Sequence, residues 1–345
     1  MNRKGFIRSM LGTAAGAPLL SKLPHWSGAE DAAAPDAVKK PPYLKPGDQI
    51  GITCPAGYIT EEEIQPALRS IESWGFRIKL GNTVGKRDFG FGGTDEERAV
   101  DLQKMINDPT VKAILCARGG YGSVRIIDRI DFSPLVKRPK WIIGFSDITV
   151  IHSHLNHNYG IASLHSKMCN SFPDDWSQTE PLQRESILSI RKALSGEYIH
   201  YPVEPSAFNK LGIGEGPLVG GNLKTLETLS GSVSDLYTAG KILFVEDTGE
   251  YLYSIDRMFW NLKRTGKLSK LKGLIVGGFR IKPDDPGEEF GRSLEEIVLE
   301  KVKDYQYPVC FDFPVGHQKN NFALKCGLRH QLLVSNKACL LTEIK

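Results

Sequence analysis

Between residue 48 and about residue 170, short apolar runs of β type alternate with segments of helical periodicity. Alternating strands and helices are the signature of βαβ units, which build a parallel sheet. We therefore predict an α/β fold. The predicted strands are residues 49–54, 77–80, 111–116 and 141–145, and the predicted helices are 60–74, 94–106 and 148–156.

The 345 residues of the chain are enough for two domains, each with its own core. The stretch 172–216 is rich in Pro, Ser and charge, and we predict that it connects an N-terminal α/β domain at 42–171 to a C-terminal domain at 217–345. In the second half we expect a Gly-Gly-Asn turn with a helix at 220–229. No apolar run after the N-terminus reaches the ~18–20 residues of a membrane span, so we predict none.

Residues 1–34 have the pattern of an export signal with its tail. Arg3, Lys4 and Arg8 form a basic start, residues 10–20 are modestly apolar, and small residues suited to cleavage follow. The basic pair resembles a twin-arginine signal with Lys in the second position, so both export routes stay open. The alternative is a disordered tail on a cytoplasmic protein.

Charge and cysteine spacing exclude several classes of function. Removing residues 1–29 takes away four basic residues and no acid, so the formal net charge falls from +4 to zero, which argues against nucleic acid as a partner. The six cysteines form no C-x-x-C pair, which argues against a structural zinc site or a dithiol redox motif. One or two disulfides and buried free thiols remain alternatives.

Ser146 stands where a bulky apolar strand runs into Gly144-Phe145-Ser146-Asp147 and then a helix. A sharp strand-to-helix turn exposes a serine oxygen and directs the first helical N–H groups at a developing oxyanion. Ile148 replaces the second glycine of the hydrolase pattern G-x-S-x-G. Ser146 is therefore either a nucleophile or a helix N-cap.

A nucleophilic serine needs a base and an acid that orients the base. His317 follows an apolar run that ends in Val-Gly, at a strand end where it can reach a cleft. Glu246 is the first polar residue after another apolar run, and Asp247 and Glu250 are its close rivals. Each of these residues, taken alone, is also compatible with a structural role.

Arg118, Gly119 and Gly120 begin a glycine-rich loop after the strand at 111–116. Such a loop lets backbone N–H groups approach a ligand closely. The loop lacks the G-K-[ST] ending of a phosphate-binding loop and the full dinucleotide spacing. An oxyanion hole completed by the N–H of Asp147 is compatible with it as well.

Three histidines, His152, His154 and His157, lie on the helix predicted after Ser146, and His165 follows. Their spacing does not match H-E-x-x-H, and only positions 154 and 157 share a helix face. We predict a solvated helix face rather than a metal site.

Six blocks in this order resemble the LD-carboxypeptidases, serine peptidases that include murein tetrapeptide carboxypeptidases and microcin-immunity hydrolases. The resemblance covers residue 42 to the C-terminus. It implies an N-terminal parallel-sheet domain like that of class I glutamine amidotransferases, which is flavodoxin-like, and a smaller C-terminal α/β domain. The blocks are CARGGYG, GFSDIT, PLVGGNLKTLETLSG, FVEDTGEYLYSIDRMFWNL, LIVGGF and FPVGHQKNN.

The resemblance also implies roles for the residues singled out above. The nucleophile falls on Ser146, the orienting acid on Glu246 and the base on His317. The oxyanion donors would be the N–H groups of Asp147 and of a glycine in the loop, most simply Gly120. The implied reaction removes the terminal D-Ala from a peptidoglycan tetrapeptide through an acyl-enzyme, which needs no metal or organic cofactor.

Further expectations follow from the same resemblance. The protein would act on muropeptides as a homodimer. Many members of the family are cytoplasmic recycling enzymes, so the export signal of this chain is a departure from the family, and it predicts a periplasmic protein. Arg118 is a candidate for binding the substrate carboxylate, since a buried carboxylate must be paired. The alternatives are a microcin-type or other acyl-peptide hydrolase and a non-catalytic muropeptide-binding protein.

Overall fold

The structure, a computed structural model, describes residues 38–344. The export signal predicted over residues 1–34 lies outside the described residues. Among the described residues, no helix combines the length and the apolar character needed to cross a bilayer.

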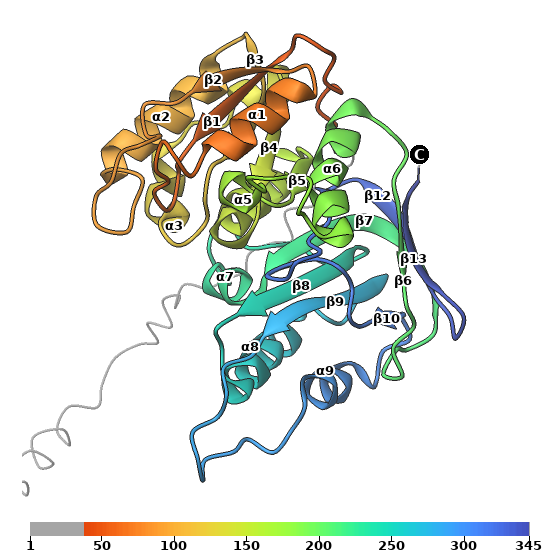
Figure 1. Cartoon of the computed structure of the whole chain (residues 1–345). Coiled ribbons are helices and arrows are strands. Elements are labelled where there is room, and N and C mark those ends of the chain that lie inside the picture. Colours follow the sequence, from red (N-terminus) through yellow and green to blue (C-terminus); the bar gives the residue numbers. More distant parts are fainter. Residues whose placement is uncertain (1–37, 345) are drawn as a thin grey trace, which may run out of the picture. The chain divides into compact units, whose positions relative to one another are not determined.

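The first sheet has six strands in the order β11-β5-β4-β3-β1-β2, of which Figure 1 labels all but β11. Neighbouring strands are parallel, except that β11 runs antiparallel to β5. The central strands are apolar on both faces, as a sheet covered by helices on both sides requires. The strands are β1 (Gln49–Thr53), β2 (Arg77–Leu80), β3 (Val111–Cys116), β4 (Trp141–Gly144), β5 (Ser163–His165) and β11 (Leu324–Cys326).

Helices cover both faces of this sheet, which confirms the predicted α/β fold. One core joins the sheet to α1 (Gln65–Ser73) and α6 (Pro181–Ser195). The core on the other face joins it to α2 (Asp95–Asn107) and α5 (Thr149–Tyr159). The short helices α3 (Ser123–Ile126) and α4 (Pro134–Lys137) pack on that face too. A capping box, in which Thr94 and Glu97 satisfy each other's backbone N–H groups, starts α2.

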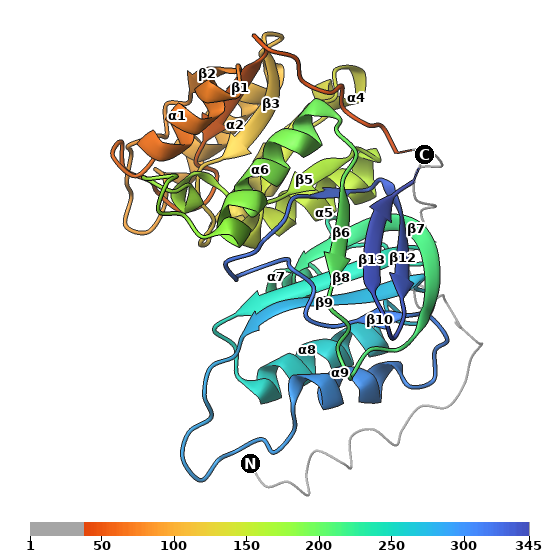
Figure 2. The same ribbon diagram turned by 45° about the vertical axis from the view of Figure 1, so that its right-hand side comes forward.

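The second sheet has seven strands in the order β10-β9-β8-β7-β12-β13-β6 (Figure 2). Its first four strands are parallel and its last three are antiparallel. Helices α7 (Leu223–Thr228), α8 (Leu252–Arg264) and α9 (Leu294–Val302) pack on one face. The strands are β6 (His200–Val203), β7 (Gly212–Asn222), β8 (Ile242–Thr248), β9 (Gly273–Arg280), β10 (Val309–Cys310), β12 (Arg329–Val334) and β13 (Cys339–Glu343).

The chain passes between the two sheets several times. The stretch 172–216, which we predicted to be a connection, contains α6 on the first sheet, then β6 and the start of β7 in the second. After β10 the chain returns to the first sheet as β11 and then adds β12 and β13 to the second. All six cysteines are buried and free, so no disulfide links these parts.

Candidate active site

The turn after β4 holds Ser146 in a strained backbone conformation. Its φ of 63° lies in the left-handed region that residues other than glycine rarely adopt. One 3-10 turn, Ser146–Ile148, leads directly into α5. Gly144 is required before the turn, because a Cβ there would lie 2.9 Å from the side chain of Ile148. Strain of this kind costs about 1–3 kcal/mol and is found mostly at functional sites.

The glycine loop after β3 lies directly against Ser146. A Cβ on Gly119 would come within 3.0 Å of the Ser146 Cβ and 3.3 Å of its Oγ. The carbonyl of Gly119 accepts a 2.8 Å hydrogen bond from the N–H of Gly57, and Gly120 has a φ of 99°. The first N–H groups of a helix have no acceptor within the helix. Backbone donors near the serine oxygen can therefore come from this loop and from the turn that contains Asp147.

The side chain of Asp147 has a different task from its backbone. It is buried, and its Oδ2 accepts a 2.7 Å hydrogen bond from the N–H of Ser123 at the start of α3. Burial raises the pKa of this carboxyl group, and the hydrogen bonds from Ser123 partly oppose that effect. The side chain thus ties the turn at Ser146 to the segment that follows the glycine loop.

The end of β7 brings the second sheet to this turn. A Cβ on Gly221 would lie 2.4 Å from the Thr149 Oγ1, and the N–H of Asn222 donates to that oxygen at 3.0 Å. Asn222 pairs in register with Glu246 on the neighbouring strand β8. Thr149, the first residue of the helix after Ser146, therefore contacts the strand β7, which lies next to the strand that carries Glu246.

Glu246 and His317 form a buried pair. The carboxylate of Glu246 has no exposed surface, and its Oε2 accepts from the Nδ1–H of His317 at 2.6 Å and from the backbone N–H of His317 at 3.2 Å. Gly316 makes this approach possible, because its φ is 103° and a Cβ on it would lie 2.4 Å from the Glu246 Cβ. Since Nδ1 carries the bonded proton, Nε2 is the ring nitrogen free to act as a base.

The residue next to Ser146 contacts His317. The rings of Phe145 and His317 have centroids 4.9 Å apart, and both line a pocket of about 590 Å³. Ser146, Glu246 and His317 come from the ends of β4 and β8 and from the loop after β10, which are far apart in sequence. The fold gathers these three predicted residues in one region.

The two rivals of Glu246 are held elsewhere. Asp247 accepts hydrogen bonds from the Asn222 side chain and from the N–H of Lys224, both at 2.9 Å, at the start of α7. Burial raises its pKa to about 6. Glu250 accepts from the hydroxyl of Ser254 in the first turn of α8.

Arg118 is held by groups of the segment 58–63. Its guanidinium lies 3.6 Å from the carboxylate of Glu63 and 3.4 Å from the carbonyl of Tyr58. It is not among the residues that line the pocket. The cation that we predicted for the substrate carboxylate is therefore already paired with an acid.

Three cations that the sequence reasoning missed line the pocket beside His317, namely Lys167, Arg280 and Lys319. Lys167 follows β5 by two residues, and Arg280 is the last residue of β9. The sequence offered one indication of Lys167 and Arg280, because each is the first charged residue after an apolar run. The strand β5 was not predicted, so Lys167 could not be placed.

The histidines of α5 do not form a solvated face, and that prediction was wrong. His152 and His154 are buried, and His152 donates from Nε2 to the carbonyl of Gly144 at 2.9 Å. The error arose because α5 lies between the first sheet and the 230–234 segment, where the hydroxyl of Ser234 contacts His154 Nδ1 at 2.8 Å. Within residues 38–344, no three His, Cys, Asp or Glu side chains gather in a way that could hold a metal ion.

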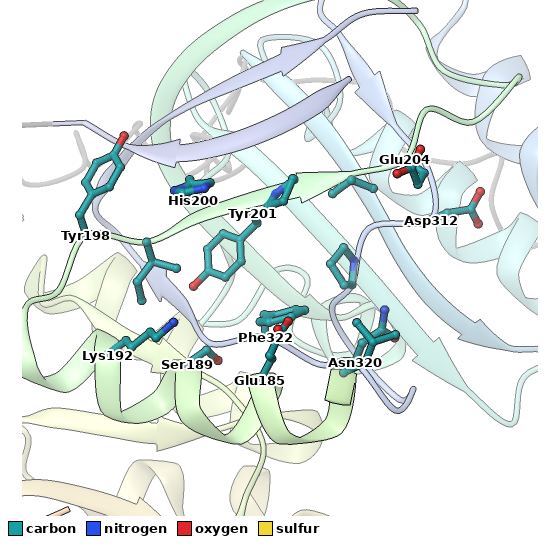
Figure 3. A pocket seen from close by; sticks show the side chains of 15 residues that line it. Glu185, Ser189, Lys192, Tyr198, His200, Tyr201, Glu204, Asp312, Asn320 and Phe322 are labelled. Atoms are coloured by element: carbon teal, nitrogen blue, oxygen red, sulfur yellow. The ribbon is translucent and has the colours of Figure 1, made fainter. Parts of the chain in front are cut away.

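A second cavity of about 550 Å³ lies between α6 and β6 (Figure 3). Ser189 and Lys192 reach it from the helix and Tyr201 from the strand. None of the three predicted catalytic residues lines it. Asn320 lines this cavity, whereas the adjacent Lys319 lines the pocket of His317, so the two cavities share a wall.

Comparisons with known proteins agree with this architecture. Residues 50–166 match the LD-carboxypeptidase N-terminal domain family, and residues 215–332 match the LD-carboxypeptidase C-terminal domain family. The chain is 33% identical over 304 residues to a probable murein peptide carboxypeptidase of Bacillus subtilis, covering 88% of this chain and 94% of the relative.

Two further proteins are similar to this chain over most of their length. The chain is 31% identical over 284 residues to the murein tetrapeptide carboxypeptidase of Pseudomonas aeruginosa, covering 81% of this chain and 91% of the relative. The crystal structure of a muramoyltetrapeptide carboxypeptidase from Oxalobacter formigenes superimposes with a TM-score of 0.76 at 27% identity, covering 86% of this chain and 99% of that one.

Proposed function

Because this chain belongs to the LD-carboxypeptidase family and is a serine-type carboxypeptidase, we propose that it removes the terminal D-Ala from peptidoglycan tetrapeptides with Ser146, His317 and Glu246 as its catalytic triad. The 2.6 Å contact between His317 Nδ1 and the buried Glu246 carboxylate carries this proposal. A histidine fixed in one tautomer by a buried acid, in the region of a strained serine, is the arrangement that activates a serine nucleophile.

In the proposed reaction, His317 Nε2 takes the proton of the Ser146 hydroxyl as the serine oxygen attacks the carbonyl before the terminal residue. The negative charge on the carbonyl oxygen is stabilised by the N–H groups of Asp147 and Gly120. When the tetrahedral intermediate collapses, His317 gives the proton to the leaving amine, and D-Ala departs.

The acyl-enzyme that remains is an ester between Ser146 and the shortened peptide. A water molecule attacks this ester while His317 accepts a proton from the water. His317 then gives the proton to the serine oxygen as the ester breaks. The carboxylate of Glu246 stabilises the imidazolium that forms in both steps. These steps consume one water and release one D-Ala and one tripeptide.

The decisive test is to incubate the mature protein with a disaccharide tetrapeptide muropeptide and to follow the mass of the product. Loss of one D-Ala with the wild type, and none with Ser146→Ala, is the expected result. If a folded wild-type protein releases no D-Ala, the substrate is a different acyl peptide. If Ser146→Ala retains activity, the nucleophile is wrong.

We also propose that the protein acts in the periplasm, which rests on the basic and apolar pattern of residues 1–34. A fusion of these residues to a reporter that is active only after export tests this. If the intact segment gives no reporter activity, the proposed localisation is wrong.

A further inference from the structure

The pocket beside His317 is unusually cationic. Lys167, Arg280 and Lys319 line it together with His317, and no carboxylate is among its lining residues. Lys319 is exposed and is neutralised by Glu180, 2.7 Å away. The other two cations have no such partner in the part of the chain that the structure describes.

Lys167 is a buried cation without a counterion. It is only 8% exposed, and its Nζ donates a single hydrogen bond, to the carbonyl of Gln318 at 3.1 Å. An ammonium group has three donors, so two stay available toward the pocket. Burial lowers the pKa of Lys167, and no carboxylate within residues 38–344 opposes that effect. Lysines are almost never buried unless they are paired, because burying an isolated charge is costly.

Arg280 presents a second group of free donors to the same pocket. It is exposed at the end of β9, and within residues 38–344 its guanidinium makes neither an ion pair nor a hydrogen bond to the protein. A guanidinium can bind both oxygens of one carboxylate, whereas an ammonium acts as a point charge. The two residues together are suited to a carboxylate ligand.

The chemistry at His317 says which carboxylate reaches this pocket. His317 delivers the proton to the leaving amine, so the nitrogen of the departing residue lies at its ring. In an α-amino acid the carboxylate carbon is only two bonds from that nitrogen, at about 1.5 Å per bond. The carboxylate of the departing residue must therefore lie near His317.

We propose that Lys167 and Arg280 bind the terminal carboxylate of the substrate and thereby restrict the enzyme to the last residue of a peptide. This inference rests on the proposed function and deepens it. An internal peptide bond has an amide where the terminal residue has its carboxylate, and the amide leaves the buried ammonium of Lys167 uncompensated. The same two residues discriminate against peptides whose terminal carboxyl group is amidated.

The test compares a tetrapeptide ending in D-Ala with the same peptide ending in D-alaninamide. The proteins are the wild type, Lys167→Met, Arg280→Gln and, as a matched control, Lys319→Met, which removes a paired cation from the same pocket. A charge-assisted hydrogen bond predicts that Lys167→Met lowers kcat/KM on the acid about 10- to 100-fold, mainly through KM. Its rate on the amide should rise or at least not fall, because no buried ammonium is left uncompensated, so the preference for the acid collapses. Lys319→Met should change that preference less than about twofold.

Several outcomes would overturn the inference. The acid preference could be unchanged in both Lys167→Met and Arg280→Gln, or the wild type could cleave acid and amide equally well. If Lys167→Met does not fold, Arg280→Gln decides alone, because Arg280 is exposed. Failure of the wild type to release D-Ala from either peptide contradicts the proposed function instead. In that case calorimetry tests the carboxylate site directly, by comparing the affinities of the wild type for acetyl-D-alanine and for acetyl-D-alaninamide. Equal affinities for the two compounds would refute the role of Lys167 and Arg280.

Discussion

Replacing Glu246 by Gln tests how much the buried carboxylate contributes to the reaction. The Oε2 of Glu246 accepts from two N–H groups of His317, one on the ring and one on the backbone. A glutamine can satisfy both donors only with its carbonyl oxygen, because its NH₂ group would face two donors. The amide should therefore adopt one orientation and keep His317 in the same tautomer, with its NH₂ group in the position of Oε1, which has no hydrogen-bond partner among the described residues.

The size of the effect follows from the geometry. With the 2.6 Å Nδ1–Oε2 contact, the charge centres of carboxylate and imidazolium are about 4 Å apart, which corresponds to about 4 kcal/mol at an effective dielectric constant of 20. That energy corresponds to a loss of about 10³-fold in kcat, with little change in KM. A loss nearer 10⁴-fold would indicate that the tautomer has changed as well.

The assay is the rate of D-Ala release from a tetrapeptide, with thermal unfolding measured in parallel. Glu250→Gln is the matched control, since the carboxylate of Glu250 bonds to Ser254 and not to His317. It should retain kcat within about threefold, as expected for a carboxylate with an ordinary local contact. If Glu246→Gln keeps a tenth or more of the wild-type kcat, or if Glu250→Gln loses more than Glu246→Gln does, the assignment of the acid is refuted.

Three other predictions concern the fold around the site. Gly316→Ala should abolish activity and lower the melting temperature, because the new Cβ would lie 2.4 Å from the Glu246 Cβ; a melting temperature equal to that of the wild type would contradict the geometry. All six cysteines should react with a thiol reagent in the denatured protein and none in the native one, and fewer than six would reveal a disulfide. Burial lowers the pKa of His152 and His330 to about 4, so the unfolded state binds more protons between pH 6.5 and 4. As the pH is lowered from 6.5 to 4, the free energy of unfolding should decrease by up to about 1.36 kcal/mol per pH unit for each histidine. In His330→Gln, the free energy of unfolding measured with urea should depend less steeply on pH, by the contribution of one proton. Asp247, whose pKa burial raises to about 6, acts in the opposite direction.

The first sheet could be predicted well because its strands are local apolar patterns. The predicted strands at 77–80 and 111–116 agree with β2 and β3 residue for residue, and the helix predicted at 94–106 begins and ends one residue before α2. The glycine-rich β7 could not be predicted. Its residues 220–222 were interpreted as a turn, yet they pair with β8, and only the helix after them was expected.

The candidate site also has a part that the sequence predicts and a part that it does not. Ser146, Glu246 and His317 follow apolar runs, and this position makes each of them a candidate from the sequence alone. The choice of Glu246 over Asp247 and Glu250 depends on which side chain faces the loop of Gly316. Contacts between residues 71 positions apart, such as that of Glu246 with His317, are set by tertiary packing, and no local pattern encodes them.

The position of β11 at the edge of the first sheet has a consequence for biosynthesis. Residues 324–326 complete that sheet by pairing with β5, and the loop just before them carries His317. A ribosome will have translated more than nine-tenths of the 345 residues before either can take its place. If Ser146 and His317 act as proposed, the nucleophile emerges long before its base, and a nascent or prematurely terminated chain has an incomplete catalytic triad.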